Sequence, residues 1–261
     1  MRNCNAGGSD GGRRQLKFRF IHSGDLHLGF PFDRLDGVVP AEAARLRAGL
    51  FAAFDRLIDM TIASGADLLL FAGDVFDRNF HCTESRRRFL EAMRKLETAG
   101  VRVLIVAGNH DPLPEWEIAP LLPGNVRLFG AEPGVERFSV DGNPAAVSVA
   151  GASHDSRRVV ANLAALTARE LAREPGFRIG LVHANVGTQQ YAAPVTLDEL
   201  KTSPVDYWAL GHMHRHELLA DRPMTAYCGS IYRLAQEENE WYAFNRITVT
   251  DGVIRRELLR I

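Results

Sequence analysis

Short apolar runs alternate with amphipathic stretches through the first half of the chain. The runs are typical of buried strands and lie at 16–21, 67–71 and 101–106. Apolar residues recur at helical spacing over 41–64 and over 83–100, where Thr83 is expected to cap the helix and Gly100 to end it. This order predicts parallel strands with right-handed crossovers, and the loops that follow such strands share one edge of the sheet.

The second half has a different pattern, in which Gly, Pro and Asn separate shorter runs. Strand-like runs occur at 126–129, 135–140, 146–150, 177–182 and 205–210, and the first three favour a meander over further crossovers. A helix is expected at 157–173. The tail at 217–261 is expected to be β-structure with an Asp-Gly hairpin turn at 251–252. Two packed sheets with helices outside them are therefore expected.

The chain is expected to form one domain at 16–261, preceded by a flexible segment at 1–15. That segment has neither the apolar centre of a signal peptide nor helical periodicity. No apolar run approaches the roughly 18 residues of a membrane span, and no stretch in the middle of the chain resembles a domain linker.

Charge and cysteine content narrow the possible functions. With 31 basic and 32 acidic residues the net charge is −1, which disfavours binding of nucleic acid by charge alone, although bound cations would add positive charge. The three cysteines are far apart and have no CxxC spacing, which favours a reduced, cytoplasmic location over secretion.

Metal-capable side chains recur where apolar runs give way to glycine or a turn. They occur in Gly-Asp-Leu-His at 24–27, Gly-Asp-Val-Phe-Asp at 73–77, Gly-Asn-His-Asp at 108–111, Leu-Val-His at 181–183 and Gly-His-Met-His at 211–214. One such block alone is usually a turn or a helix cap. Five blocks, holding five of the nine histidines, form a set of oxygen and imidazole ligands suited to two divalent cations.

In this order the five blocks resemble the calcineurin-like metallophosphoesterase superfamily. The segments at 25–29, 73–77 and 108–111 are similar to the SbcD and YhaO type of bacterial DNA repair exonuclease, and those at 20–23 and 207–214 strengthen the match. The resemblance covers 17–261. It implies an α/β fold, a four-layer αββα sandwich of two packed mixed β-sheets flanked by helices.

The resemblance also implies a set of metal ligands. One cation would be held by Asp25, His27, Asp74 and His214, and a second by Asp74, Asn109, His183 and His212, with Asp74 bridging the two. Imidazole ligands suit a transition metal, so manganese is expected first, with iron or zinc as alternatives. A hydroxide shared by the two cations would attack the phosphorus atom in line.

Residues next to these ligands in the sequence are expected to act on the substrate phosphate. His110 is expected to contact the phosphate and to protonate the leaving oxygen, with Asp111 orienting its ring. Asp77 is placed near the substrate phosphate, where it would orient a ligand or the loop rather than bind metal. Arg78 is assigned to the phosphate, because protein phosphatases of the superfamily have a phosphate-binding arginine in this string.

Other polar residues are given structural roles. Three arginines at 86–88 could meet a phosphate backbone, but a charge run on a helix is more often its solvated face. We expect His22 to be a strand residue, His154 a loop residue, and His216 an extension of the strand that carries His212.

Three functions are compatible with these motifs. The first is a nuclease of the DNA repair type, favoured over protein phosphatases by Leu28-Gly29 and by Asp111, where those phosphatases have glutamate. The second is a phosphatase or phosphodiesterase for smaller substrates, and the third is a non-catalytic scaffold. The longer nucleases continue into a capping domain and a segment that docks an SbcC-type ATPase, and neither is expected within these residues.

Overall fold

The computed structural model of the protein describes residues 16–77, 82–140, 143–187, 190–234 and 242–261. The expected flexible segment at 1–15 and the proposed phosphate ligand Arg78 lie outside the described residues.

The first sheet has six strands and is largely parallel. Its order is β12 (Val253–Arg260), β11 (Ala243–Thr250), β1 (Lys17–Ser23), β2 (Leu68–Ala72), β3 (Arg102–Val106) and β4 (Val126–Leu128). Strands β1 to β4 are parallel, whereas β11 pairs antiparallel with both β1 and β12. The turn between β11 and β12 has positive φ at both Asp251 and Gly252, 52° and 79°, which confirms the predicted Asp-Gly hairpin.

The second sheet also has six strands. Its order is β5 (Gly134–Val140), β6 (Asn143–Ala152), β7 (Phe177–His183), β8 (Tyr207–Gly211), β10 (Met224–Tyr227) and β9 (Glu217–Asp221). The expected meander was wrong except for the antiparallel pair β5 and β6, because β4 joins the first sheet and β6, β7, β8 and β10 are parallel. Both faces of β8 are buried, as a parallel strand between two layers requires.

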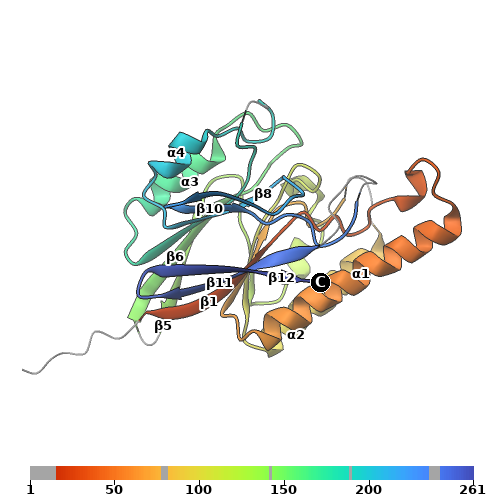
Figure 1. The fold of residues 1–261 in the computed structure, drawn as a ribbon, viewed down its shortest axis with the longest axis horizontal. Helices are drawn as coiled ribbons and strands as arrows, with labels where there is room; N and C mark the ends of the chain where they lie inside the picture. Colours follow the sequence, from red (N-terminus) through yellow and green to blue (C-terminus); the bar gives the residue numbers. More distant parts are fainter. Residues whose placement is uncertain (1–15, 78–81, 141–142, 188–189, 235–241) are drawn as a thin grey trace, which may run out of the picture.

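Helices cover the outer face of each sheet (Figure 1). Helices α1 (Pro40–Ala63) and α2 (Thr83–Thr98) lie on one side, and α3 (Leu163–Leu171) and α4 (Leu197–Lys201) on the other. Short 3-10 helices occupy Phe32–Arg34, Ala119–Leu121 and Leu113–Glu115. None of the described helices has the length and apolar content to cross a bilayer.

Three apolar layers hold these elements together. In β2, Leu69 and Phe71 pack with Phe54 of α1 and other residues of the first layer, whereas Leu68 and Leu70 pack between the two sheets. Alternate residues of one strand therefore serve two cores, as the pleat requires. A third layer joins β7 and β8 to α3 and α4, which confirms the predicted four-layer αββα sandwich.

Two helix starts differ from prediction, and one helix was not predicted. Thr83 is the first residue of α2 and not its cap, because Cys82 is the N-cap and makes no side-chain capping bond. Helix α3 begins only at Leu163, since the side chain of Asn162 accepts a hydrogen bond from the Ala165 amide at 2.9 Å. Helix α4, which was not predicted, starts at a capping box formed by Thr196 and Glu199.

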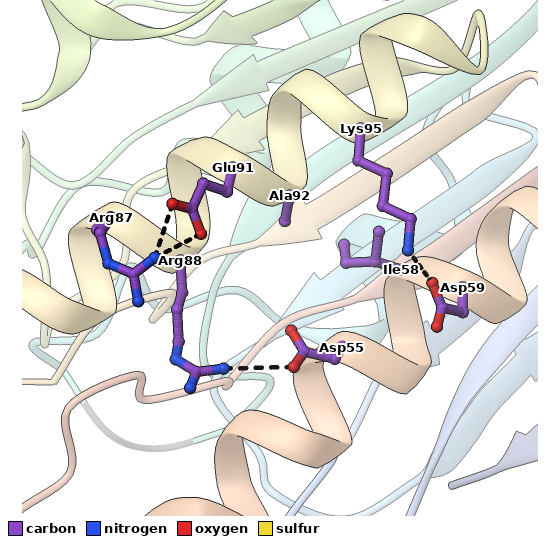
Figure 2. Close-up of a pocket in the computed structure, with 8 residues that line it drawn as sticks. All are labelled: Asp55, Ile58, Asp59, Arg87, Arg88, Glu91, Ala92 and Lys95. Carbon is purple, nitrogen blue, oxygen red and sulfur yellow. Dashed lines mark hydrogen bonds and ion pairs between the residues drawn. The ribbon is translucent and has the colours of Figure 1, made fainter.

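A groove of about 500 Å³ lies between α1 and α2 and contains the second and third arginines of the run at 86–88. Figure 2 shows Arg88 paired with Asp55 and Arg87 paired with Glu91, at 3.4 and 2.7 Å. Arg86 pairs with Glu117 at 2.9 Å. The groove is lined by none of the predicted metal ligands. These contacts favour a solvated, ion-paired helix surface over a phosphate site.

His22 connects the two sheets. It lies on β1, as predicted, is fully buried, and its Nε2 lies 3.2 Å from the Leu210 carbonyl oxygen of β8. Because a carbonyl can only accept, Nε2 carries the proton and Nδ1 accepts from the Tyr207 hydroxyl at 2.9 Å. Burial lowers the pKa of His22 to about 3.

We predict that His22 makes stability depend on pH. Below its ordinary pKa of 6.5 the unfolded chain binds a proton that the folded chain does not, so the free energy of unfolding falls as pH falls from 6.5 toward 3. The contribution is about 1.4 kcal/mol per pH unit. In urea titrations between pH 7.5 and 5, His22→Gln is expected to be less stable at pH 7.5 and to lose less stability on acidification. Equal losses in both proteins would contradict this role.

Candidate metal centre

Loops from both sheets meet at the carboxyl ends of the parallel strands. The loop after β1 is bound to the loop after β2 by backbone bonds from the Asp25 amide to Gly73 and from the His27 amide to Asp74, both 3.0 Å. The loop after β8 joins them, because the His212 amide lies 3.1 Å from both oxygens of Asp25. The five polar blocks predicted to converge do so.

One set of donors surrounds His27. Its Nε2 lies 3.2 Å from Nε2 of His214, and one ring nitrogen of each of these histidines lies within 4.8 Å of a carboxylate oxygen of Asp25. Asp25 and His27 are buried, with exposed fractions of 0% and 1%. These three side chains are members of the first predicted ligand set.

A second set of donors surrounds His183. Its Nε2 lies 3.0 Å from Oδ1 of Asn109 and 3.4 Å from Oδ2 of Asp74. The ring of His212 packs edge-on against the ring of His183 at a centroid distance of 5.3 Å. All four members of the second predicted set therefore lie together.

Asp74 lies between the two sets. Its Oδ2 is 3.7 Å from Nε2 of His27 in the first set and 3.4 Å from Nε2 of His183 in the second. Its Oδ1 accepts a hydrogen bond from the His110 amide at 2.8 Å. One carboxylate oxygen thus faces imidazoles of both sets, which is the position expected for a bridging ligand.

The backbone of the ligand loops is strained. Among the described residues six non-glycine residues have positive φ, and four of them are predicted ligands: Asp25, His27 and Asp74 at 48–49°, and His212 at 106°. Each such residue costs of order 1–3 kcal/mol and persists where the surroundings enforce it, commonly at functional sites. The fold holds these four side chains in place at a cost to stability.

Two glycines make room for the ligands. A Cβ at Gly108 would overlap the Asp74 carboxylate, and one at Gly211 would overlap the Ala72 carbonyl and approach Nδ1 of His183 to 3.0 Å. Only glycine allows the three loops to approach so closely.

Burial keeps the imidazoles neutral. It lowers the pKa of His183 to about 3 and of His212 to about 4, and it also lowers the pKa of His27. A neutral imidazole offers a lone pair to a cation. The Nδ1 atom of His183 is bonded to the Ala72 carbonyl at 2.8 Å, which leaves Nε2 as the ligating nitrogen.

The carboxylates need a positive counter-charge. Burial, together with the charge of Asp74, raises the pKa of Asp25 to about 7. For Asp74 burial also acts to raise the pKa, but His183 and His27, which become cationic in the acid range where Asp74 titrates, hold its pKa below the usual range. Buried acids among neutral imidazoles and an amide oxygen form a donor set that fits divalent cations.

Asp111 was predicted to orient the ring of His110, and this was wrong. Its Oδ1 accepts from the amides of Gly108 and Asp74 at 2.8 and 3.1 Å, and its Oδ2 from those of Val75 and Phe76 at 2.9 and 3.1 Å. The buried carboxylate therefore fixes the loop that carries Asp74.

Asp77 contacts the ring of His110 instead. Its Oδ1 lies 2.8 Å from Nδ1 of His110 and 3.1 Å from Nδ1 of His27. Burial acts to raise the pKa of Asp77, but hydrogen bonds from these two imidazoles hold it below its usual range. Asp77 is placed to orient both rings, and no phosphate contact is needed to explain it.

Three supporting residues were not identified from the sequence. His154 lies in a loop as predicted, but it is buried, and its Nε2 bonds to the His183 carbonyl at 2.7 Å. Cys228 Sγ lies 3.5 Å from Oδ2 of Asp25, and Ser230 Oγ donates to the Asp25 carbonyl at 3.0 Å. Each follows an apolar strand, the same signal that marked the five polar blocks.

His216 was wrongly predicted to extend a strand; it lies in the turn between β8 and β9.

Metal binding is expected to stabilise the protein through Asp74. Manganese added to EDTA-treated protein at about 100 times its Kd should contribute about 2.7 kcal/mol, an increase in Tm of roughly 5–10 °C. Asp74→Asn should remove most of this increase in differential scanning fluorimetry. The control Asp59→Asn, a 59% exposed carboxylate in the helix groove, should retain it. Equal increases in both variants would contradict the assignment.

Comparisons with known proteins agree with this geometry. Residues 18–216 match the calcineurin-like phosphoesterase family. An uncharacterized metallophosphoesterase of Bacillus subtilis, YhaO, is 32% identical over 249 residues, covering 92% of this chain and 60% of YhaO. The SbcD component of the nuclease SbcCD from Escherichia coli K12 is 25% identical over 258 residues, covering 84% of this chain and 62% of SbcD.

The chain thus spans about three-fifths of the length of these curated relatives. A crystal structure of a dimetal phosphatase from Danio rerio matches 93% of this chain and 98% of that protein, with a TM-score of 0.53 and 11% identity, which supports the fold alone. On the family match, the arrangement of its two sheets and the metal-capable residues at their shared edge, the chain belongs to the calcineurin-like phosphoesterase family of hydrolases.

Proposed function

We propose that this protein is a two-metal phosphodiesterase that cleaves DNA, a nuclease of the repair type. The observation that carries the proposal is the position of Asp74, whose Oδ2 faces imidazoles of both ligand sets at 3.7 and 3.4 Å. When bound, a pair of divalent cations supplies Lewis acidity toward a phosphoryl group and its attacking water. Asp25, His27, Asp74 and His214 would hold one ion, and Asp74, Asn109, His183 and His212 the other.

The donor set favours manganese over other divalent cations. It combines carboxylate and amide oxygens with imidazole nitrogens and has no thiolate, since burial holds the pKa of the nearby Cys228 thiol well above its usual range. Such a set suits Mn²⁺ first, with Fe²⁺ or Zn²⁺ next.

His110 is the residue we assign to the leaving group. Asp77 accepts a hydrogen bond from its Nδ1 and so orients the ring, which leaves Nε2 to donate a proton to the leaving oxygen. The side chain is 28% exposed, whereas that of His27 beside it is 1% exposed. A side chain that donates a proton to a substrate must be accessible from solvent, and His110 meets this condition.

Two features support DNA as the substrate. The chain is similar to the SbcD component of a nuclease over 84% of its length. In addition, a cavity of about 420 Å³ lies against Asn109 and His212 and is lined by Arg157 and Arg158. Cationic side chains beside the ligands suit a substrate that carries phosphates on both sides of the cleaved bond.

A substrate comparison tests the proposal. With manganese, the wild type is expected to cleave single-stranded DNA or duplex ends faster than it hydrolyses p-nitrophenyl phosphate, a small monoester. His110→Ala should lower kcat on DNA by about 10²- to 10⁴-fold, because the leaving oxygen loses its proton donor. It should keep the increase in Tm produced by metal. Hydrolysis of the monoester alone would show a phosphatase and end the nuclease proposal.

Asp77→Asn tests the orienting role. Loss of a carboxylate that orients a ligand or catalytic imidazole typically costs 10- to 100-fold in activity or metal affinity. We expect kcat on DNA to fall by this factor while KM changes less than threefold. The matched variant Asp111→Asn should instead lower Tm in the absence of metal, because an NH2 group in place of one carboxyl oxygen cannot accept from the backbone amides that bond to that oxygen. Activity of Asp77→Asn equal to wild type would refute the role.

A further inference from the structure

Two loops beside the metal centre are fixed to each other by backbone pairing. Val159 and Ala192 form an isolated parallel bridge, and the Ala193 amide donates to the Val159 carbonyl at 2.8 Å. Ala192 in turn accepts from the Asn185 amide at 2.8 Å. Ala193 has a φ of 46°, which is uncommon for alanine and shows that the pairing enforces the path of this loop.

Arg158 and Tyr191 adjoin this pairing and contact each other. The guanidinium carbon of Arg158 lies 4.9 Å from the centroid of the Tyr191 ring, in a cation–π contact. Tyr191 is 46% exposed, and Arg158 is also exposed. A large aromatic ring is thus kept at the surface, where it holds a cation.

The two neighbouring arginines differ in how their charge is balanced. Arg157 is paired with Glu115, with Nη2 and Nε at 2.7 and 3.2 Å from Oε1. Arg158 takes part in none of the ion pairs found in the described part of the chain. Its charge therefore remains available to an anion, and the Tyr191 ring restricts its rotamers before the anion binds.

The cavity of about 420 Å³ joins this pair to the metal centre. Its lining consists of Asn109, His212, Arg157, Arg158, Tyr191 and Ala192. A phosphate bound between the two ligand sets would lie at one end of this cavity, and Arg158 lines the same cavity. A polynucleotide carries a further phosphate beside the one that is cleaved, and Arg158 is an exposed cation of this cavity that could bind it.

We infer that Arg158, held by Tyr191, binds the phosphate adjacent to the one that is cleaved in a polynucleotide substrate. The inference rests on the proposed function and adds a subsite to it. A planar guanidinium can donate two parallel hydrogen bonds to one phosphate. A contact of this kind positions the strand and does not read its sequence.

Binding of a 5′-fluorescein-labelled dT20 oligonucleotide in EDTA tests the subsite without turnover. Arg158→Ala should raise Kd about three- to tenfold at 50 mM salt. It should also reduce the slope of log K against log salt by about 0.7, the value for one phosphate contact on a single strand. Tyr191→Leu should weaken binding with little change in slope, because the charge remains. Arg255→Ala is the control: this exposed arginine of β12 lies level with Arg19 at the start of β1, away from the metal centre, and should bind as wild type.

Turnover with manganese separates failure of the subsite from failure of the proposed function. The loss of kcat/KM in Arg158→Ala should be several times greater on dT20 than on bis(p-nitrophenyl) phosphate, a diester without a neighbouring phosphate. If wild type cleaves dT20 while Arg158→Ala matches it in salt slope and kcat/KM, the subsite is refuted and the nuclease proposal stands. If wild type neither binds nor cleaves dT20, both are refuted.

Discussion

The rest of this structure depends on a buried carboxylate, that of Asp74, which lies where the edges of the two sheets meet and whose charge must be compensated. Asp74 is 2% exposed and lies between His27 and His183, and Asp25 is fully buried beside them. Charges in such a place are costly unless they are compensated, and the nearby imidazoles are kept neutral by burial. A pair of divalent cations would resolve this conflict, which supports the proposal of a metal centre at this place.

The fold holds the candidate ligands in place at the expense of conformational strain in their loops. Parallel strands bring the loops to one edge, and three of the loops contain ligands with left-handed backbone. Asp111 fixes the loop of Asp74 through backbone amides, while Asp77 fixes two imidazoles. A single change in these supports is therefore expected to affect geometry at several ligands together. Asp111 thus fixes the backbone of the loop, and Asp77 fixes the orientation of the His27 and His110 rings.

The positions of the candidate ligands could be predicted from the sequence because their signal is local. Each predicted ligand stands one to six residues past an apolar run, and the carboxyl ends of parallel strands share an edge, so Asp25, Asp74 and Asn109 could be placed together from the pattern alone. His183, His212 and His214 were joined to them through the family resemblance. The sandwich followed from the same runs.

Roles that depend on the path of a loop were not predictable in this way. Asp111 is adjacent to His110 in sequence, yet the loop turns its carboxylate toward the amides of Val75 and Phe76. His154 also follows an apolar run, but its contact with the His183 carbonyl appears only when β6 is placed beside β7. The residues of the strand at 126–128 do not indicate which of the two sheets it joins, because its pairing with β3 depends on tertiary packing.

Anomalous diffraction from crystals of the manganese-loaded protein tests the central claim most directly. The account predicts two manganese peaks about 3.5–4 Å apart, with a carboxylate oxygen of Asp74 within ligand distance of both. A single peak, or two peaks of which only one contacts Asp74, would contradict it.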